Sequence, residues 1–190
     1  ETTAAVDTSG RVTVWASNKA PFILRQMIAQ ALALPISQIH IASVAVGGDF
    51  GGKGTAQTEP ICVLLALKSR RPVRLTLSRE EELTAPFLKE ATTTHLKIGV
   101  SRDGALLALQ GHIIYDTGAY CDLVGGMARS CNDIHGPYRI PNVELTATRV
   151  YTNNSPRGHM RAPPTPQPVF AMESHLDMTA SKLGIDPVEF

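Results

Sequence analysis

A dense run of glycines near residue 50 constrains the fold of this chain more than any other feature. A strand-like stretch, Ile39 to Val46, leads into Gly47-Gly48-Asp49-Phe50-Gly51-Gly52-Lys53-Gly54. Residues 55–68 then have the apolar spacing of a helix. Closely spaced glycines let backbone N–H groups approach a ligand, and a strand, a glycine turn and a helix N-terminus together form an anion-binding corner. The pattern therefore predicts an anion site at 47–54.

A nucleotide phosphate loop is one interpretation of this run. Gly47, Gly52 and Lys53 fit most of its pattern, but the next residue is Gly54, and Thr55 comes one position late to ligate magnesium. No second apolar strand ends in an acidic residue that would complete such a metal site. A purely structural glycine turn is the other simple interpretation, and the residues alone leave both open.

The composition is ordinary for a globular protein. Of 190 residues, 43% are hydrophobic and 18% are charged, and the formal net charge is +1. This balance gives no electrostatic case for nucleic acid as a partner. No apolar stretch approaches the roughly 20 residues that a membrane span needs. We therefore expect a soluble protein of the cytoplasm or periplasm, with the compartment left open.

The cysteines indicate neither a zinc site nor a disulfide framework, because Cys62, Cys121 and Cys131 lack paired spacing. Cys62 lies in an apolar helical run, which predicts a buried thiol. The sequence has no initiator methionine, and residue 1 falls inside an expected strand. We expect a piece of a longer protein.

The order of elements predicts an α+β fold in two layers, with mixed sheets, helices on one face and two subdomains that each begin with a hairpin. The expected strands are 3–6, 11–17, 39–46, 73–77, 94–100, 105–115 and 143–152. The expected helices begin near Pro21, at Thr55, at a capping box of Ser78 and Glu81, and at Gln167. The helix from Thr55 is apolar over much of its surface, so we expect it to lie between other elements.

The two expected halves are residues 1–90, with the glycine loop 47–54, and residues 91–190, with loops 116–137 and 153–166. These loops are too rich in Gly, Pro, Arg and His to be plain connectors, and loops on a rigid scaffold are where sites usually lie. In the final helix, Phe170, Met172, Leu176 and Met178 are expected near the inner side, with Gly184 as the C-terminal cap.

Five motifs in one order resemble the molybdenum-binding (large) subunit of the xanthine dehydrogenase and aldehyde oxidase family. They are Gly47 to Lys53, Tyr115-Asp116-Thr117-Gly118-Ala119-Tyr120, Gly136-Pro137-Tyr138-Arg139-Ile140-Pro141-Asn142, Tyr151-Thr152-Asn153 with Arg161, and Leu183-Gly184-Ile185-Asp186-Pro187-Val188-Glu189-Phe190. The resemblance spans essentially the whole chain.

The resemblance implies a molybdenum hydroxylase, an oxidoreductase that oxidises an aldehyde or an aromatic N-heterocycle. Its cofactor is molybdenum bound by molybdopterin, as the cytosine or a related dinucleotide, and water supplies the inserted oxygen. Electrons leave through iron–sulfur clusters on a partner domain or subunit, where FAD is a further expected group. The rest of the large subunit is the other expected partner. We expect no cofactor and no activity in the chain by itself.

The resemblance also implies roles for individual residues. The phenylalanine of the glycine loop, here Phe50 between Gly48 and Gly51, offers its backbone N–H to an oxo ligand of the metal. An N–H fixed by flanking glycines is a preorganised donor to such an oxygen. Arg161 matches an arginine on the second wall of the metal site, where a permanent cation suits an anionic cofactor. Phe50 and Arg161 thus lie near the metal's ligands without being side-chain ligands.

Arg129 falls where purine-oxidising members keep an arginine that stabilises negative charge on the substrate; the alternative is a solvent-facing loop arginine. Gly54 stands where those members carry a glutamate that binds substrate, and Pro163 replaces an aromatic that stacks on it. Both belong to the implied substrate pocket, and neither favours xanthine. No cysteine follows Arg161, so a copper-bearing carbon monoxide dehydrogenase site is not supported.

Asp49 departs from the family pattern, in which glycine is more usual. A carboxylate beside an anionic cofactor is unfavourable unless it points away or is paired with Arg or Lys. This residue motivates an alternative hypothesis, a non-catalytic scaffold or assembly module with the same fold. The family's general base is a glutamate beyond Phe190, and none of Glu80, Glu81, Glu82 or Glu90 takes that role.

Overall fold

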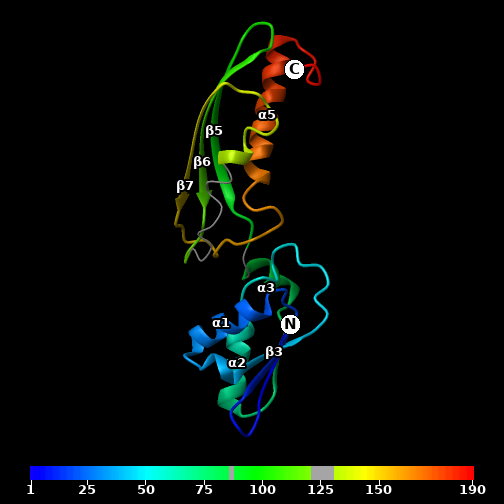
Figure 1. Cartoon of the computed structure of the whole chain (residues 1–190), viewed down its shortest axis with the longest axis vertical. Coiled ribbons are helices and arrows are strands. Elements are labelled where there is room, and N and C mark those ends of the chain that lie inside the picture. The colour runs from blue at the N-terminus through cyan, green and yellow to red at the C-terminus, as the bar shows by residue number, and fades with distance from the viewer. Residues whose placement is uncertain (86–87, 121–130) are drawn as a thin grey trace. The chain divides into compact units, whose positions relative to one another are not determined.

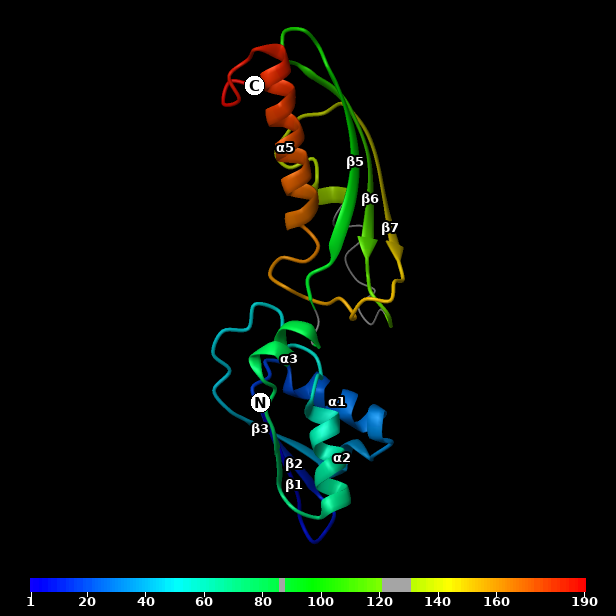
Figure 2. The same ribbon diagram turned by 180° about the vertical axis from the view of Figure 1, so that it is seen from behind.

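The computed structural model describes residues 1–85, 88–120 and 131–190. Its contacts divide the chain into two compact units, Glu1–Pro86 and Phe87–Phe190. Figures 1 and 2 show each unit as a sheet with helices packed against it. The α+β fold class with mixed sheets, predicted from the sequence, is confirmed. The described helices are all too short or too polar to cross a lipid bilayer.

The first unit contains a sheet of four strands in the order β3-β2-β1-β4. The strands are β1 (Thr2–Val6), β2 (Val12–Ala16), β3 (Ile39–Ser43) and β4 (Val73–Leu75). β1 pairs antiparallel with β2 and with β4, whereas β2 pairs parallel with β3. The hairpin turn before β2 is closed by Asp7, whose carboxylate accepts the N–H groups of Ser9 and Arg11 at 2.9 Å.

Helices of the first unit are α1 (Pro21–Leu32), the 3-10 helix η1 (Ile36–Gln38), α2 (Glu59–Ser69) and α3 (Arg79–Thr84). α1 and α2 contact each other and the sheet. The core between them and the strands consists of Ala4, Val12, Val14, Ala16, Leu24, Ile28, Ile39, Cys62, Val63 and Ala66. The capping box of Ser78 and Glu81 is present at α3.

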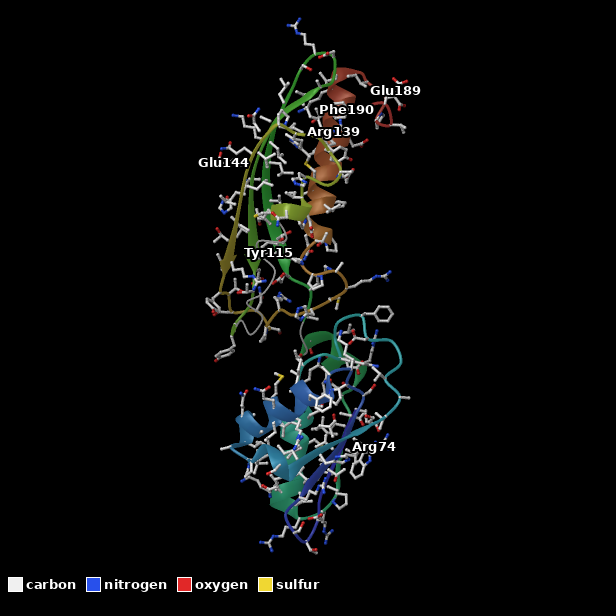
Figure 3. All side chains as sticks on the ribbon, in the orientation of Figure 1. Arg74, Tyr115, Arg139, Glu144, Glu189 and Phe190 are labelled. Carbon is white, nitrogen blue, oxygen red and sulfur yellow. The ribbon has the colours of Figure 1, made fainter. Side chains whose placement is uncertain are left out.

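The second unit is a sheet of three strands in the order β5-β6-β7, and helix α5 (Pro166–Leu183) covers one of its faces (Figures 1 and 2). β5 (Ala91–Val100) and β6 (Leu106–Asp116) are antiparallel, and β7 (Asn142–Val150) is parallel to β6. Tyr115 of β6, labelled in Figure 3, is fully buried beneath the sheet's covered face. Its neighbours in this core include Leu109, Ile113, Ile134, Met172 and Leu176.

Several local predictions were wrong. The strand expected to reach Val46 ends at Ser43, and the helix expected from Thr55 begins at Glu59. On α5, Phe170 is 75% exposed and Met178 is 56% exposed, although Met172 and Leu176 are buried as expected. These two positions lie two residues from the buried ones, about 200° around the helix.

α2 also differs from expectation, because it buries only one face within the described unit. Cys62, Val63 and Ala66 are fully buried, whereas Ile61 is 54% exposed and Leu65 is 43% exposed. The buried thiol expected at Cys62 is confirmed, and burial raises the pKa of that thiol. At pH 7 it therefore stays protonated.

Candidate functional site

The glycine loop is longer than the sequence pattern predicts, since it runs from residue 44 to residue 58, between β3 and α2. β3 stops at Ser43 because its partner β2 stops at Ala16, the residue that pairs with Ser43. Residues 44–46 thus have no neighbouring strand. Because α2 begins well after Gly54, the expected corner of strand, glycine turn and helix N-terminus does not form, and neither does the local frame of a nucleotide phosphate loop.

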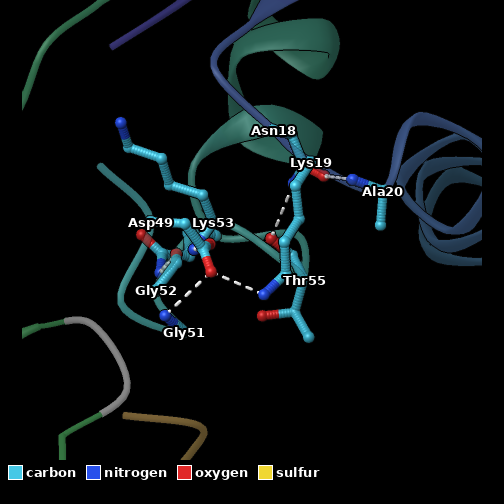
Figure 4. Close-up of polar contacts among 9 residues, drawn as sticks. Asn18, Lys19, Ala20, Asp49, Gly51, Gly52, Lys53 and Thr55 are labelled. Atoms are coloured by element: carbon cyan, nitrogen blue, oxygen red, sulfur yellow. Dashed lines mark hydrogen bonds and ion pairs between the residues drawn. The ribbon is translucent and has the colours of Figure 1, made fainter. Parts of the chain in front are cut away.

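Asp49 is the centre of this loop's hydrogen bonds (Figure 4). Its carboxylate accepts the N–H groups of Gly51 and Lys53, both at 2.9 Å, and the ammonium of Lys19 at 2.5 Å. The backbone carbonyl of Asp49 accepts the N–H of Gly52 at 2.9 Å. The hydrogen bond from Lys19 is the main reason why the pKa of Asp49 lies below its usual value. The carboxylate is ionised and paired.

The loop is also tied to the connection between β2 and α1. The backbone N–H of Lys19 donates to the carbonyl of Lys53 at 2.9 Å, and the side chain of Asn18 donates to the carbonyl of Thr55 at 3.2 Å. The ammonium of Lys53 turns back to the carbonyl of Val46. Lys53 therefore supports the loop from inside, as a structural residue would.

Phe50 lies at the tip of the loop with its side chain 66% exposed. Its φ is 49°, in the left-handed region that few residues other than glycine adopt. A Cβ on Gly48 would come within 2.7 Å of the Phe50 ring, so any other residue there would require this exposed ring to move. Among the described residues, no acceptor receives the N–H of Phe50 or of Gly48. These two donors are available for a ligand.

Gly54 lies in the loop close to the side chain of Lys19. A Cβ on Gly54 would lie 3.1 Å from Cε of Lys19 and 3.8 Å from its Nζ. Thus the space that a residue with a side chain would occupy at this position is partly filled by the lysine. This contact could not be predicted from the sequence, because Lys19 is far from the loop along the chain.

Arg161 lies in the second unit, in the connection between β7 and α5, and is exposed. Arg161 and Ala162 have φ values of 27° and 53°, again unusual for residues with side chains. Lys89 holds this turn, since its ammonium donates to the carbonyls of Met160 and Arg161, both at 2.8 Å. Burial lowers the pKa of Lys89. Lys89 is a second residue that sequence reasoning missed.

Glu90, the residue after Lys89, is bound by side chains from β7 and α5. The side chains of Glu90 and Arg149 are 10% and 15% exposed and form an ion pair of 3.3 Å. Burial raises the pKa of Glu90, although Arg149 and His159 oppose that shift. Glu90 is therefore a largely buried carboxylate that is paired with Arg149 of β7. The side chain of Gln167 binds its backbone carbonyl at 2.8 Å.

Asp116 ties together two of the motifs noted in the sequence. Its carboxylate accepts the N–H of Gly118 at 2.9 Å, the side-chain amide of Asn154 at 2.6 Å and the hydroxyl of Thr152. Arg157 lies 3.6 Å from the same carboxylate. The hydrogen bond from Thr152 is the largest cause that lowers the pKa of Asp116. This network joins the motif Asp116-Thr117-Gly118 to Thr152 of the motif Tyr151-Thr152-Asn153.

The candidate residues thus fall into two groups. Gly48, Phe50, Gly51 and Gly54 share the glycine loop of the first unit, and Arg161 and Pro163 share a loop of the second unit. Arg129 lies outside the described residues.

Solved structures first define the class of protein. The chain is similar to the aldehyde oxidoreductase of Desulfovibrio gigas, with a TM-score of 0.88, 26% identity, and coverage of 99% of this chain and 21% of that one. It is equally similar to quinoline 2-oxidoreductase of Pseudomonas putida 86, with a TM-score of 0.88, 29% identity, and coverage of 99% and 25%. Both similar structures are larger oxidoreductases.

The family follows from the sequence comparisons. The family model of the molybdopterin cofactor-binding domain matches residues 1–190, and the chain belongs to that family. It is 36% identical to the nicotinate dehydrogenase large molybdopterin subunit of Eubacterium barkeri, over 96% of this chain and 43% of that protein. It is 36% identical to the xanthine dehydrogenase molybdenum-binding subunit of Escherichia coli O157:H7, over 98% and 25%. The resemblance drawn from the motifs is confirmed, and the chain spans less than half the length of these relatives.

Proposed function

We propose that this chain is the segment of a molybdopterin-dependent hydroxylase that supplies the oxo-ligand loop and one wall of the substrate pocket. The observation that carries the proposal is the backbone N–H of Phe50. Phe50 has a φ of 49° and is followed directly by Gly51, and its N–H has no acceptor among the described residues. An aligned donor of this kind stabilises an oxygen that carries negative charge without reorganising.

The residues fit an anionic, oxygen-bearing group at this loop. Gly48 and Phe50 offer N–H donors, and the charge of Asp49 is balanced by Lys19 at 2.5 Å. When bound, the molybdenum cofactor supplies the metal centre at which oxygen from water is inserted into the substrate. This chain's part is to hold and orient, through the N–H of Phe50 and the close approach that Gly48 and Gly51 allow.

On the second loop, we propose that Arg161 provides a permanent positive charge toward the anionic cofactor. A guanidinium keeps its charge at every physiological pH and can donate several hydrogen bonds at once. Lys89 binds the carbonyls of Met160 and Arg161, so it holds the backbone turn that carries this side chain. We assign Arg129 to stabilising negative charge on the bound substrate.

The proposed substrate is an aldehyde or an aromatic N-heterocycle, in keeping with relatives named as nicotinate dehydrogenase, aldehyde oxidoreductase and quinoline 2-oxidoreductase. Gly54 and Pro163 line its pocket in this proposal. They offer neither a carboxylate nor an aromatic face, which argues against xanthine. The proposal includes a cytosine dinucleotide form of the cofactor, an iron–sulfur partner, FAD on a partner, and the cytoplasm or periplasm as the compartment.

The test is metal and pterin analysis of the full-length protein purified with its partner subunits. We expect molybdenum and pterin in equal amounts, together with oxidation of an aldehyde or heterocycle. Activity that persists in preparations lacking both would refute the proposal.

A variant series then tests the assigned residues. Arg129→Ala should lower kcat far more than it lowers cofactor content, because the arginine is assigned to the reacting substrate. Arg102→Ala, in the turn between β5 and β6, is the matched control and should change neither quantity. Unchanged kinetics in Arg129→Ala would return that residue to the solvent-facing surface.

Asp49 is the one observation that favours a second candidate, a scaffold or assembly module without cofactor. If the protein is such a scaffold, cofactor should be found only in the Asp49→Gly variant, in which the negative charge is removed. The proposed function expects the opposite order, because Asp49 closes the loop through Gly51 and Lys53. Cofactor content of the two proteins separates the candidates. A nucleotide enzyme is tested more simply, since binding of ATP or GTP would be required and none is expected.

A further inference from the structure

We infer that Lys19 and Asp49 form a brace that sets the shape of the glycine loop, which makes Lys19 a positioning residue for the backbone N–H of Phe50. The inference rests on the proposed function only for the identity of the ligand that this N–H receives. The shape of the loop can be measured without any ligand.

Asp49 accepts hydrogen bonds from some of the N–H groups of its own loop and leaves others without a partner in the described part of the chain. The carboxylate accepts those of Gly51 and Lys53, and the Asp49 carbonyl accepts that of Gly52. Three successive donors are therefore directed into the loop. Among the described residues, the N–H groups of Gly48 and Phe50 stay without an acceptor. Asp49 thus acts as an internal anion and leaves only the tip for an external one.

Lys19 binds the loop at two points. Its ammonium contacts the Asp49 carboxylate at 2.5 Å, and its backbone N–H donates to the carbonyl of Lys53 at 2.9 Å. Lys19 itself sits between β2 and α1, next to Asn18, which is buried and binds the carbonyl of Thr55. These bonds tie the loop to the connection between β2 and α1 in its own unit (Figure 4).

The main effect of the Lys19–Asp49 pair is on the shape of the loop rather than on global stability. The side chains of Lys19 and Asp49 are 51% and 23% exposed, and exposed ion pairs add little to global stability. Loss of Lys19 should therefore leave the fold intact but free the carboxylate to move. An unpaired Asp49 would also place uncompensated negative charge beside an anionic ligand.

Gly54 lies next to the side chain of Lys19. A Cβ at this position would lie 3.1 Å from Cε of Lys19, so the lysine side chain would have to shift by a few tenths of an ångström to admit it. Gly54→Ala should therefore change exchange in the loop less than Lys19→Met does.

The experiment is hydrogen–deuterium exchange of the full-length protein in its cofactor-free form, read on peptides that span residues 47–54. Asp49→Ala should speed exchange at Gly51 and Lys53 by about tenfold or more, because each amide loses a charged acceptor. Lys19→Met should give a smaller change in the same amides, and Lys19→Arg should restore slow exchange. Arg74→Met is the control without effect, because Arg74 lies on the edge strand β4, away from the loop, and its exposed ion pair is with Glu1.

Loaded enzyme supplies the second readout. Lys19→Met should lower molybdenum content and kcat with little change in KM, and Lys19→Arg should recover both. Equal exchange in wild type, Asp49→Ala and Lys19→Met would overturn the brace. Wild-type protein that lacks molybdenum would refute the proposed function instead, and the exchange result would still decide whether the brace exists.

Discussion

Replacing Gly118 with alanine should be among the most damaging small changes available in the second unit. Gly118 has a φ of 67°, and a Cβ there would lie 2.1 Å from the carbonyl oxygen of Ser155 and 3.0 Å from that of Asn154. Both neighbours are backbone atoms, so no side chain can rotate away. The backbone near Ser155 would have to shift by about an ångström to reach normal contact.

The size of the effect can be worked from the contacts. The left-handed φ costs alanine about 1 kcal/mol. The shift would break the hydrogen bond from the Ala119 N–H to the Asn154 carbonyl, now 3.0 Å, at about 1 kcal/mol. Overpacking against a fixed backbone adds about 1–3 kcal/mol. The sum is about 3–5 kcal/mol, a large part of the roughly 5–15 kcal/mol that stabilises a typical domain.

Gly184→Ala is the matched control, since Gly184 has a φ of 69° and no atom within 4 Å of a new Cβ. It carries the conformational cost without the steric one. In urea titrations followed by far-ultraviolet circular dichroism, 3 kcal/mol corresponds to a midpoint shift of about 1.5 M at a slope of about 2 kcal/mol/M. Equal midpoints for the two variants would refute the steric argument.

Three further outcomes are expected. Asp116 has a lowered pKa, so its carboxylate stabilises the fold fully at pH values above the unfolded pKa of about 3.9. This contribution is lost as the pH falls through the folded pKa. Asp116→Asn should therefore reduce stability at neutral pH, and its urea midpoint should fall less steeply with acidification. Met172→Ala should cost about 2–5 kcal/mol because the side chain is fully buried, whereas Met178→Ala should stay within about 0.5 kcal/mol in the same titration. Cys62 should resist iodoacetamide at neutral pH until urea unfolds the chain, as peptide mass spectrometry would show, because burial raises its pKa.

Local signals in the sequence predicted the fold well. The turn at Asp7 and the capping box at Ser78 are made by residues only a few positions apart, so their chemistry is visible in the linear order. The αL cap at Gly184 is of the same kind. Helix starts were less secure. α2 begins at Glu59, just before Pro60, and proline favours the first turn of a helix and disfavours helix before it. That signal was the better guide than the apolar spacing from Thr55.

The candidate site was predictable only in part, because its shape depends on contacts between distant residues. The glycines and the family resemblance pointed to Phe50 and Arg161. Nothing in the linear pattern pointed to Lys19 beneath the first loop or to Lys89 beneath the second. A lysine on a connection looks the same whether it faces solvent or a carbonyl, and only the fold distinguishes the two. The same holds for Asp49: its negative charge looked unfavourable in the sequence, but in the fold its carboxylate accepts hydrogen bonds from Lys19, Gly51 and Lys53.

The strand order of the first unit has a consequence for how it folds. β1 and β2 can pair as soon as their hairpin exists, but the other edge of β1 waits for β4, which comes after two helices and the glycine loop. Long-range pairing of this kind is slow, and an unpaired strand edge invites association with other chains. During synthesis, the edge of Thr2–Val6 that faces away from β2 therefore stays unpaired until Val73–Leu75 has been made.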